Sequence, residues 1–233
     1  MHTVIKMKKT FKEKLIQLFI VLLPAIIAFG TNCIAYIGSP LFIREDRLIF
    51  LDMEIDRMIP FIPQFVIIYG ASFLQWLNYF LQGCFGPEKL RNKYFSADTV
   101  AKIFCFFFFI LCPIAMRWPQ LDPNGGLWIK LVSFAYGVDS PARAFPSLHC
   151  FYSWMAARYS FEREPKERKW ISWLQLAYSI SLFASTVLIK QHYFVDIIGG
   201  VGLAELSLQL AAHTKLPELF GKLVKKITDK IPH

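Results

Sequence analysis

Residues 15–37 read LIQLFIVLLPAIIAFGTNCIAYI, a run without a single charged side chain. A transmembrane helix needs about 20 mostly apolar residues, so this stretch predicts a helix that crosses a bilayer. A cleaved signal peptide is the alternative, because the run follows a basic N-terminal segment. No clean small-residue cleavage site follows it, and the rest of the chain also requires a membrane. We therefore expect the helix to be retained.

The rest of the 233-residue chain has the same apolar character. Hydrophobic residues make up 55% of the chain and charged residues 18%, whereas typical soluble domains carry about 25% charged residues. This composition excludes a disordered chain, a coiled coil and a secreted disulfide scaffold. We predict six membrane-spanning helices, at about residues 15–37, 61–83, 99–117, 146–159, 170–190 and 192–212. The expected fold class is an all-α, polytopic membrane bundle, with residues 1–233 forming a single domain.

The basic residues support this arrangement of spans. Six spans place 19 of the 26 Lys and Arg residues on one side of the membrane, and the positive-inside rule makes that side the cytoplasm. Both termini are then cytoplasmic. Nucleic-acid binding would also suit the net charge of +9, but the basic residues alternate with long apolar runs, so we expect no nucleic-acid partner. The short chain and the absence of a glycosylation signature favour a bacterial cell membrane.

Residues 38–60 are too charged to span a membrane. Within 41–59, apolar side chains recur at helical spacing, at Leu48, Leu51, Ile55, Met58 and Ile59. We therefore predict an amphipathic helix on the outer membrane surface, and a lid or a contact with a lipid headgroup is the more specific alternative. Residues 118–145, which contain Pro and Gly near their start, are predicted to form an outer loop.

Ionisable residues gather where the predicted spans meet the outer side, at residues 116–119, 143–149 and 185–196. Such residues are costly at membrane depth, which makes them candidates for function. On a helix, His192 and Asp196 would share one face. The carboxylate can then orient the imidazole and leave one ring nitrogen free as a nucleophile or base. A buried structural pair and a metal site are the alternatives, but no further ligand stands at suitable spacing, so we expect neither metal nor cofactor.

The sequence Pro146-Ser147-Leu148-His149 predicts the start of a helix, because Pro and Ser are common there. Helix capping alone accounts for the first two residues but not for His149. The free N–H groups of a helix N-terminus, here including the backbone of Leu148, bind phosphate. A histidine beside them can protonate a leaving oxygen.

Together these residues resemble the type 2 phosphatidic acid phosphatase superfamily, whose three sequence blocks are K-x6-R-P, P-S-G-H and S-R-x5-H-x3-D. The second block reads PSLH here, and the third keeps its spacing from Ser185 through His192 to Asp196 but has Thr186 in place of Arg. The first block is the poorest, since Trp118 separates Arg117 from a proline and no Lys stands upstream at the family spacing. The resemblance covers about residues 100–200.

The resemblance implies that His192 is the nucleophile on phosphorus, that Asp196 orients it and that His149 protonates the leaving group. It also implies that Ser147 and Ser185 help to hold the phosphoryl oxygens, without a metal. Lys190 stands one helical turn after Thr186, so we expect it to replace the missing Arg as a phosphate-binding cation. The other candidate cations are Arg117 and Arg143.

We expect an integral membrane enzyme whose active site lies at the outer face and whose substrate is a lipid phosphate or diphosphate. Transfer of the phosphoryl group to water would make it a lipid phosphatase acting through a phosphohistidine. Transfer to an alcohol would make it a phosphotransferase, and the PSLH variant is also similar to headgroup transferases related to inositol phosphorylceramide and sphingomyelin synthases. A non-catalytic, lipid-binding or transport descendant is the third hypothesis. Phosphatidic acid, phosphatidylglycerophosphate and polyprenyl diphosphate all remain possible substrates.

Overall fold

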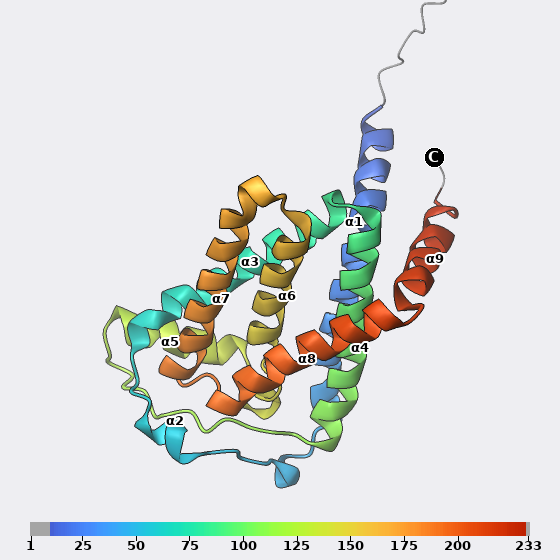
Figure 1. The fold of residues 1–233 in the computed structure, drawn as a ribbon. Helices are drawn as coiled ribbons and strands as arrows, with labels where there is room; N and C mark the ends of the chain where they lie inside the picture. Colours follow the sequence, from blue (N-terminus) through green and yellow to red (C-terminus); the bar gives the residue numbers. More distant parts are fainter. Residues whose placement is uncertain (1–9, 232–233) are drawn as a thin grey trace, which may run out of the picture.

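The computed structural model describes residues 10–231, and Figure 1 shows how they fold. The α-helices of this part are α1 (Phe11–Cys33), α2 (Glu54–Met58), α3 (Val66–Phe85), α4 (Glu88–Leu111), α5 (Leu127–Val138), α6 (Leu148–Arg163), α7 (Lys169–Leu188), α8 (Phe194–His213) and α9 (Leu216–Thr228). Within the described residues, the only β-type pairing is an isolated bridge between Ile49 and Ile114. The predicted all-α class is therefore confirmed.

The six predicted spans coincide with α1, α3, α4, α6, α7 and α8. Four helical stretches are long and apolar enough to cross a membrane, namely Phe11–Leu41, Glu88–Leu111, Lys166–Leu188 and Phe194–His213. Helix α6 has only 16 residues, and α3 includes buried polar side chains. Four candidate spans are thus confirmed, whereas the count of six crossings stays a prediction.

Polar side chains of α3, α6 and α7 form one hydrogen-bond network. The Gln75 amide on α3 donates to Gln175 Oε1 at 3.0 Å and to Ser179 Oγ at 3.3 Å. Ser153 on α6 donates its hydroxyl proton to Gln75 Oε1. Hydrogen bonds between helices satisfy polar groups that lipid cannot. This network explains how two helices with polar side chains occupy the middle of an apolar bundle.

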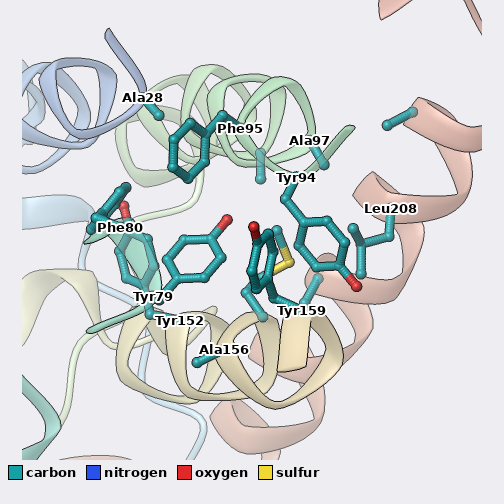
Figure 2. Packing of buried hydrophobic residues seen from close by; sticks show 14 of the residues in the cluster. Ala28, Tyr79, Phe80, Tyr94, Phe95, Ala97, Tyr152, Ala156, Tyr159 and Leu208 are labelled. Atoms are coloured by element: carbon teal, nitrogen blue, oxygen red, sulfur yellow. The ribbon is translucent and has the colours of Figure 1, made fainter. Parts of the chain in front are cut away.

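Aromatic rings fill the core between α3, α4 and α6 (Figure 2). The largest buried rings are those of Tyr79, Tyr94, Phe95, Tyr152 and Tyr159. Beside them, Lys102 Nζ lies 3.0 Å from Asp98 Oδ1, and both side chains are fully buried. The Lys102 ammonium lies 3.4 Å from the ring centroid of Phe151 on α6. Because ring faces attract cations, this contact holds α4 against α6.

The segment from residue 38 to residue 60 differs from the prediction. The sequence predicts one amphipathic helix over 41–59, but α2 has only five residues. Instead, Ile49 pairs with residues 113–115. Its N–H donates to the Pro113 carbonyl at 2.9 Å, and its own carbonyl accepts from Ala115 N at 2.7 Å. Pairing with this distant segment overrides the local helical period. A position on the outer membrane surface stays a prediction.

The region after α4 also differs from the prediction. The third span was expected to run to Arg117, but α4 ends at Leu111, because Pro113 cannot continue a helix. The expected outer loop at residues 118–145 contains α5. Val132 and Tyr136 of α5 are buried in a cluster with residues of α3 and α7. The Pro and Gly residues at the start of this region favoured a loop, so the apolar helix that follows them was not predicted.

Candidate active site

The connection between α7 and α8 presents His192. Helix α7 ends at Leu188, and Lys190 adopts a left-handed conformation with φ of 55°. The chain then turns back, so that the N–H groups of Gln191 and His192 both donate to the Thr186 carbonyl, at 2.9 and 3.1 Å. His192 therefore lies in a tight turn before α8 and not on a helix.

Asp196 reaches back from the first turn of α8 to orient this histidine. Its Oδ2 lies 3.1 Å from His192 Nδ1 and accepts from Tyr193 N at 2.9 Å. The predicted contact is present, although its geometry is that of a helix N-terminus instead of one helical face. When Nδ1 carries the proton, Nε2 keeps a lone pair, and Nε2 has no hydrogen-bond partner among residues 10–231.

The second motif begins α6 directly beside this turn. The Ser147 hydroxyl caps the helix by accepting from Cys150 N at 3.3 Å, and Ser147 N donates to the Asp196 carbonyl at 3.1 Å. A Cβ atom at Gly200 would lie 2.4 Å from the Ser147 carbonyl oxygen. Only glycine therefore permits α8 to approach the start of α6 so closely.

His149 lies close to His192, with 5.9 Å between the ring centroids. It is packed between the rings of Tyr69 and Trp76, whose centroids lie 4.4 and 4.9 Å away. Its Nε2 atom has no hydrogen-bond partner in the described part of the chain. The N–H groups of Leu148 and His149 belong to the first turn of α6, where helix geometry supplies no internal acceptor. Two imidazole nitrogens and a helix N-terminus thus come together.

The three predicted cations occupy different places. Arg143 lines the same cavity as the two histidines. Its Nε is buried without a hydrogen-bond partner in residues 10–231, and its Cζ lies 3.9 Å from the ring centroid of Tyr36. Burial lowers the pKa of this guanidinium, and the nearby Asp139 carboxylate opposes the shift. An arginine nevertheless stays charged at neutral pH. Arg117 is exposed and stacks on the Phe50 ring at 4.4 Å.

Lys190 does not lie on one helical face with Thr186, because α7 ends before it. Its ammonium donates to the carbonyls of Asp56 and Ile59, away from the histidines. Ser185 is buried, and its hydroxyl donates to the Leu182 carbonyl at 2.8 Å. Neither Lys190, Ser185 nor Arg117 lines the cavity, so the structure brings only Arg143 of the three cations to the histidines.

Asp139 is a polar residue at the site that sequence reasoning missed. It lines the cavity, and its Oδ2 accepts from Gln191 Nε2 at 2.7 Å and from Tyr69 OH at 3.3 Å. Gln191 lies inside the third block, but Tyr69 and Asp139 are far from it in the sequence and belong to none of the motifs. The position of Asp139 four residues before Arg143 was the only signal that could have suggested it.

The cavity has a volume of about 910 Å³ and is lined mainly by apolar side chains of α1, α3 and α5. Its polar lining residues include Asp139, Arg143, His149 and His192. On α3 the lining extends from Val66 to Cys84, a length of about 27 Å at 1.5 Å per residue. Among the described residues, no three His, Cys, Asp or Glu side chains are grouped to hold a metal ion.

Comparison with known proteins agrees with this arrangement. The family model described as the PAP2 superfamily matches residues 92–210. No curated protein and no solved structure matches the chain. The matched region runs from α4 into α8 and contains both histidines, Ser147 and Asp196. Because it covers just over half of the 233 residues and includes the whole histidine site, the chain belongs to the PAP2 superfamily.

Proposed function

We propose that this protein is an integral membrane phosphatase that hydrolyses a lipid phosphate through a phosphohistidine at His192. Membership of the PAP2 superfamily suggests a phosphatase or phosphotransferase activity. One observation carries the specific proposal. An imidazole oriented by a buried carboxylate has a free Nε2 beside a second histidine, in a cavity with long apolar walls.

In the first step, the lone pair of His192 Nε2 attacks phosphorus, and the bond from phosphorus to the lipid oxygen breaks. His149, which carries a proton while the phosphate dianion is bound, gives it to that oxygen, so the lipid leaves as a neutral alcohol and His149 becomes neutral. Asp196 stabilises the positive charge that forms on the His192 ring. We propose that the N–H groups at the start of α6 and the Arg143 guanidinium bind the phosphoryl oxygens.

In the second step, a water molecule attacks the phosphohistidine and His149, now neutral, takes its proton. The bond between phosphorus and Nε2 breaks, inorganic phosphate leaves, and His192 returns to its starting state. His149 thus acts first as an acid and then as a base, and both protons are accounted for.

The apolar walls suit the hydrocarbon part of such a substrate. The lining of α3 is about 27 Å long at 1.5 Å per residue, whereas one half of a bilayer core is about 15 Å thick. A lipid chain that enters from the membrane could therefore lie along α1 and α3 while its phosphate reaches the histidines. We propose a long-chain lipid phosphate as the substrate class.

The charge of the site favours a second candidate, transfer of a phospho-headgroup to an alcohol. A phosphate monoester carries nearly two negative charges near pH 7, and a phosphodiester carries one. Among the predicted cations only Arg143 lines the cavity, and Asp139 lines it as well. Because the Asp139 carboxylate offsets the charge of Arg143, the cavity is better matched to the single charge of a phosphodiester lipid, as in headgroup transferases.

An activity assay distinguishes these candidates. The purified protein is incubated with phosphatidic acid, phosphatidylglycerophosphate, polyprenyl diphosphate or a phosphodiester lipid, with and without an alcohol acceptor. Phosphate release that needs no alcohol supports the phosphatase. A headgroup-bearing product that requires the alcohol supports the transferase. His192→Ala should abolish either reaction, and full turnover in that variant would rule out the nucleophile assignment.

We also propose that the active site faces the outer side and that both termini are cytoplasmic. The start of α1 and the whole of α9 lie at one end of the molecule, and α2 lies at the other (Figure 1). In a background without the five native cysteines, the exposed Asn124→Cys should react with an impermeant thiol reagent from outside. The equally exposed Glu167→Cys should not. Labelling of Glu167→Cys and not of Asn124→Cys would indicate the opposite orientation.

A further inference from the structure

The turn that carries His192 is attached to a segment more than 130 residues away in the chain. Lys190 Nζ donates to the Asp56 carbonyl at 2.7 Å and also to the Ile59 carbonyl. These carbonyls belong to the last turn of α2 and the residue after it. A cation at the C-terminal end of a helix is favourably placed, because the carbonyls there have no intrahelical donors.

Asp56 makes the reciprocal contact. Its Oδ1 accepts from Phe194 N, the first residue of α8, at 2.7 Å, while its Oδ2 accepts from Met53 N at 3.0 Å. Only 8% of Asp56 is exposed. A carboxylate is favourably placed at a helix N-terminus, where N–H groups are free and the dipole is positive.

The contacts of Lys190 and Asp56 fix the chain on both sides of His192. Lys190 stands two residues before His192 and Phe194 stands two residues after it. A third bond, from Ile62 N to the Leu188 carbonyl at 2.9 Å, joins the same two segments. The left-handed conformation of Lys190 is uncommon for a residue with a side chain. Such a conformation persists where surrounding contacts over-determine it, and the Lys190 bonds to α2 supply them.

We propose that Asp56 and Lys190 are positioning residues, which hold the turn between α7 and α8 so that His192 Nε2 stays directed at the phosphorus atom. This proposal rests on the proposed function of His192. It gives the Asp56 carboxylate and the carbonyls of Asp56 and Ile59 a role in catalysis through the turn, without contact with the substrate. It also assigns Lys190 a task other than phosphate binding.

Nucleophile alignment sets the size of the expected effect. A displacement of about 1 Å in a reacting group lowers a rate by on the order of a hundredfold. Asp56→Asn leaves one acceptor oxygen for the N–H groups of Phe194 and Met53, and Lys190→Met removes both bonds to the carbonyls of α2 and Ile59. Either loss should let the turn move by a fraction of that distance. We therefore expect Asp56→Asn and Lys190→Met each to slow phosphorylation of His192 by roughly ten- to hundred-fold, with KM changed less than about twofold, since neither residue touches the substrate.

Arg57→Met is the matched control. Arg57 belongs to the same helix and pairs with Asp52 at 2.8 Å, but its side chain is 72% exposed, and its hydrogen bonds within the described residues go to Asp52 and not to the turn. This variant should keep the parental rate. All rates are measured in single turnovers with a long-chain lipid phosphate and are divided by the folded fraction, which thermal unfolding of each variant gives.

Hydrogen exchange provides a readout that needs no activity. Peptides covering residues 189–195 should exchange faster in Asp56→Asn and Lys190→Met than in the parent or in Arg57→Met. Faster exchange together with slower phosphorylation supports the proposal. Unchanged exchange, or faster exchange with a parental rate, overturns it. Full activity of His192→Ala would instead contradict the proposed function, and the exchange result would still report whether Asp56 and Lys190 hold the turn.

Discussion

Asp196→Asn tests the central assumption about the site with almost no change in shape. The parent carboxylate is fully buried, lies 3.1 Å from His192 Nδ1 and accepts from Tyr193 N at 2.9 Å. Asparagine has one acceptor oxygen, and its amide group can only donate. If that amide faces Nδ1, the imidazole must place its proton on Nε2, and the nucleophilic lone pair is lost.

Two effects determine the expected magnitude. A hydrogen bond to a charged group contributes about 1.5–3 kcal/mol, which corresponds to roughly ten- to hundred-fold in rate. The wrong imidazole tautomer adds to this loss, since amide replacement of a histidine-orienting carboxylate lowers kcat by about 10⁴-fold in another enzyme class. We therefore expect kcat of Asp196→Asn to fall by about 10²–10⁴-fold.

The assay is the initial rate of product formation from the best lipid substrate, together with rapid-quench detection of the phosphohistidine. Asp122→Asn is the matched control, because the Asp122 carboxylate is exposed and accepts from Asn124 N at 2.9 Å in the loop before α5. Thermal unfolding checks that both variants are folded. A folded Asp196→Asn protein with kcat within about tenfold of the parent would refute the assigned role of this carboxylate.

Three further predictions concern the cation, the helix contact and the metal. Arg143→Met should raise KM or lower kcat by roughly ten- to hundred-fold, whereas Arg117→Met, an exposed arginine outside the cavity, should stay within about twofold in the same kinetic assay. Gly200→Ala should lower the free energy of unfolding by about 1–3 kcal/mol through overpacking. Gly202→Ala is the control, because a Cβ atom at that position would meet no atom within 4 Å. Thermal unfolding measures the stability of both variants. Activity should survive an excess of chelator, and its complete loss with recovery on adding one divalent ion would contradict the mechanism.

Local sequence determined the long helices and the candidate site residues. A long apolar run predicts a membrane helix without knowledge of the rest of the chain, because a helix in lipid makes all of its backbone hydrogen bonds within itself. Helices α1, α4, α7 and α8 follow from such runs. The spacing of His192 and Asp196 was equally informative, since both residues lie within one turn of the start of α8. The family motifs then linked this pair to Ser147 and His149.

Only the tertiary structure decided which charged groups reach the site. The sequence favoured Lys190 as the phosphate-binding cation over Arg117 and Arg143, yet Arg143 alone among them lines the cavity. Lys190 is directed to α2 because α7 ends two residues before it and its backbone turns left-handed. The extended pairing of Ile49 likewise depends on residues 113–115. Periodicity records which face of a segment is buried, but the partner of a polar side chain depends on segments far away in the chain, and no local pattern contains that information.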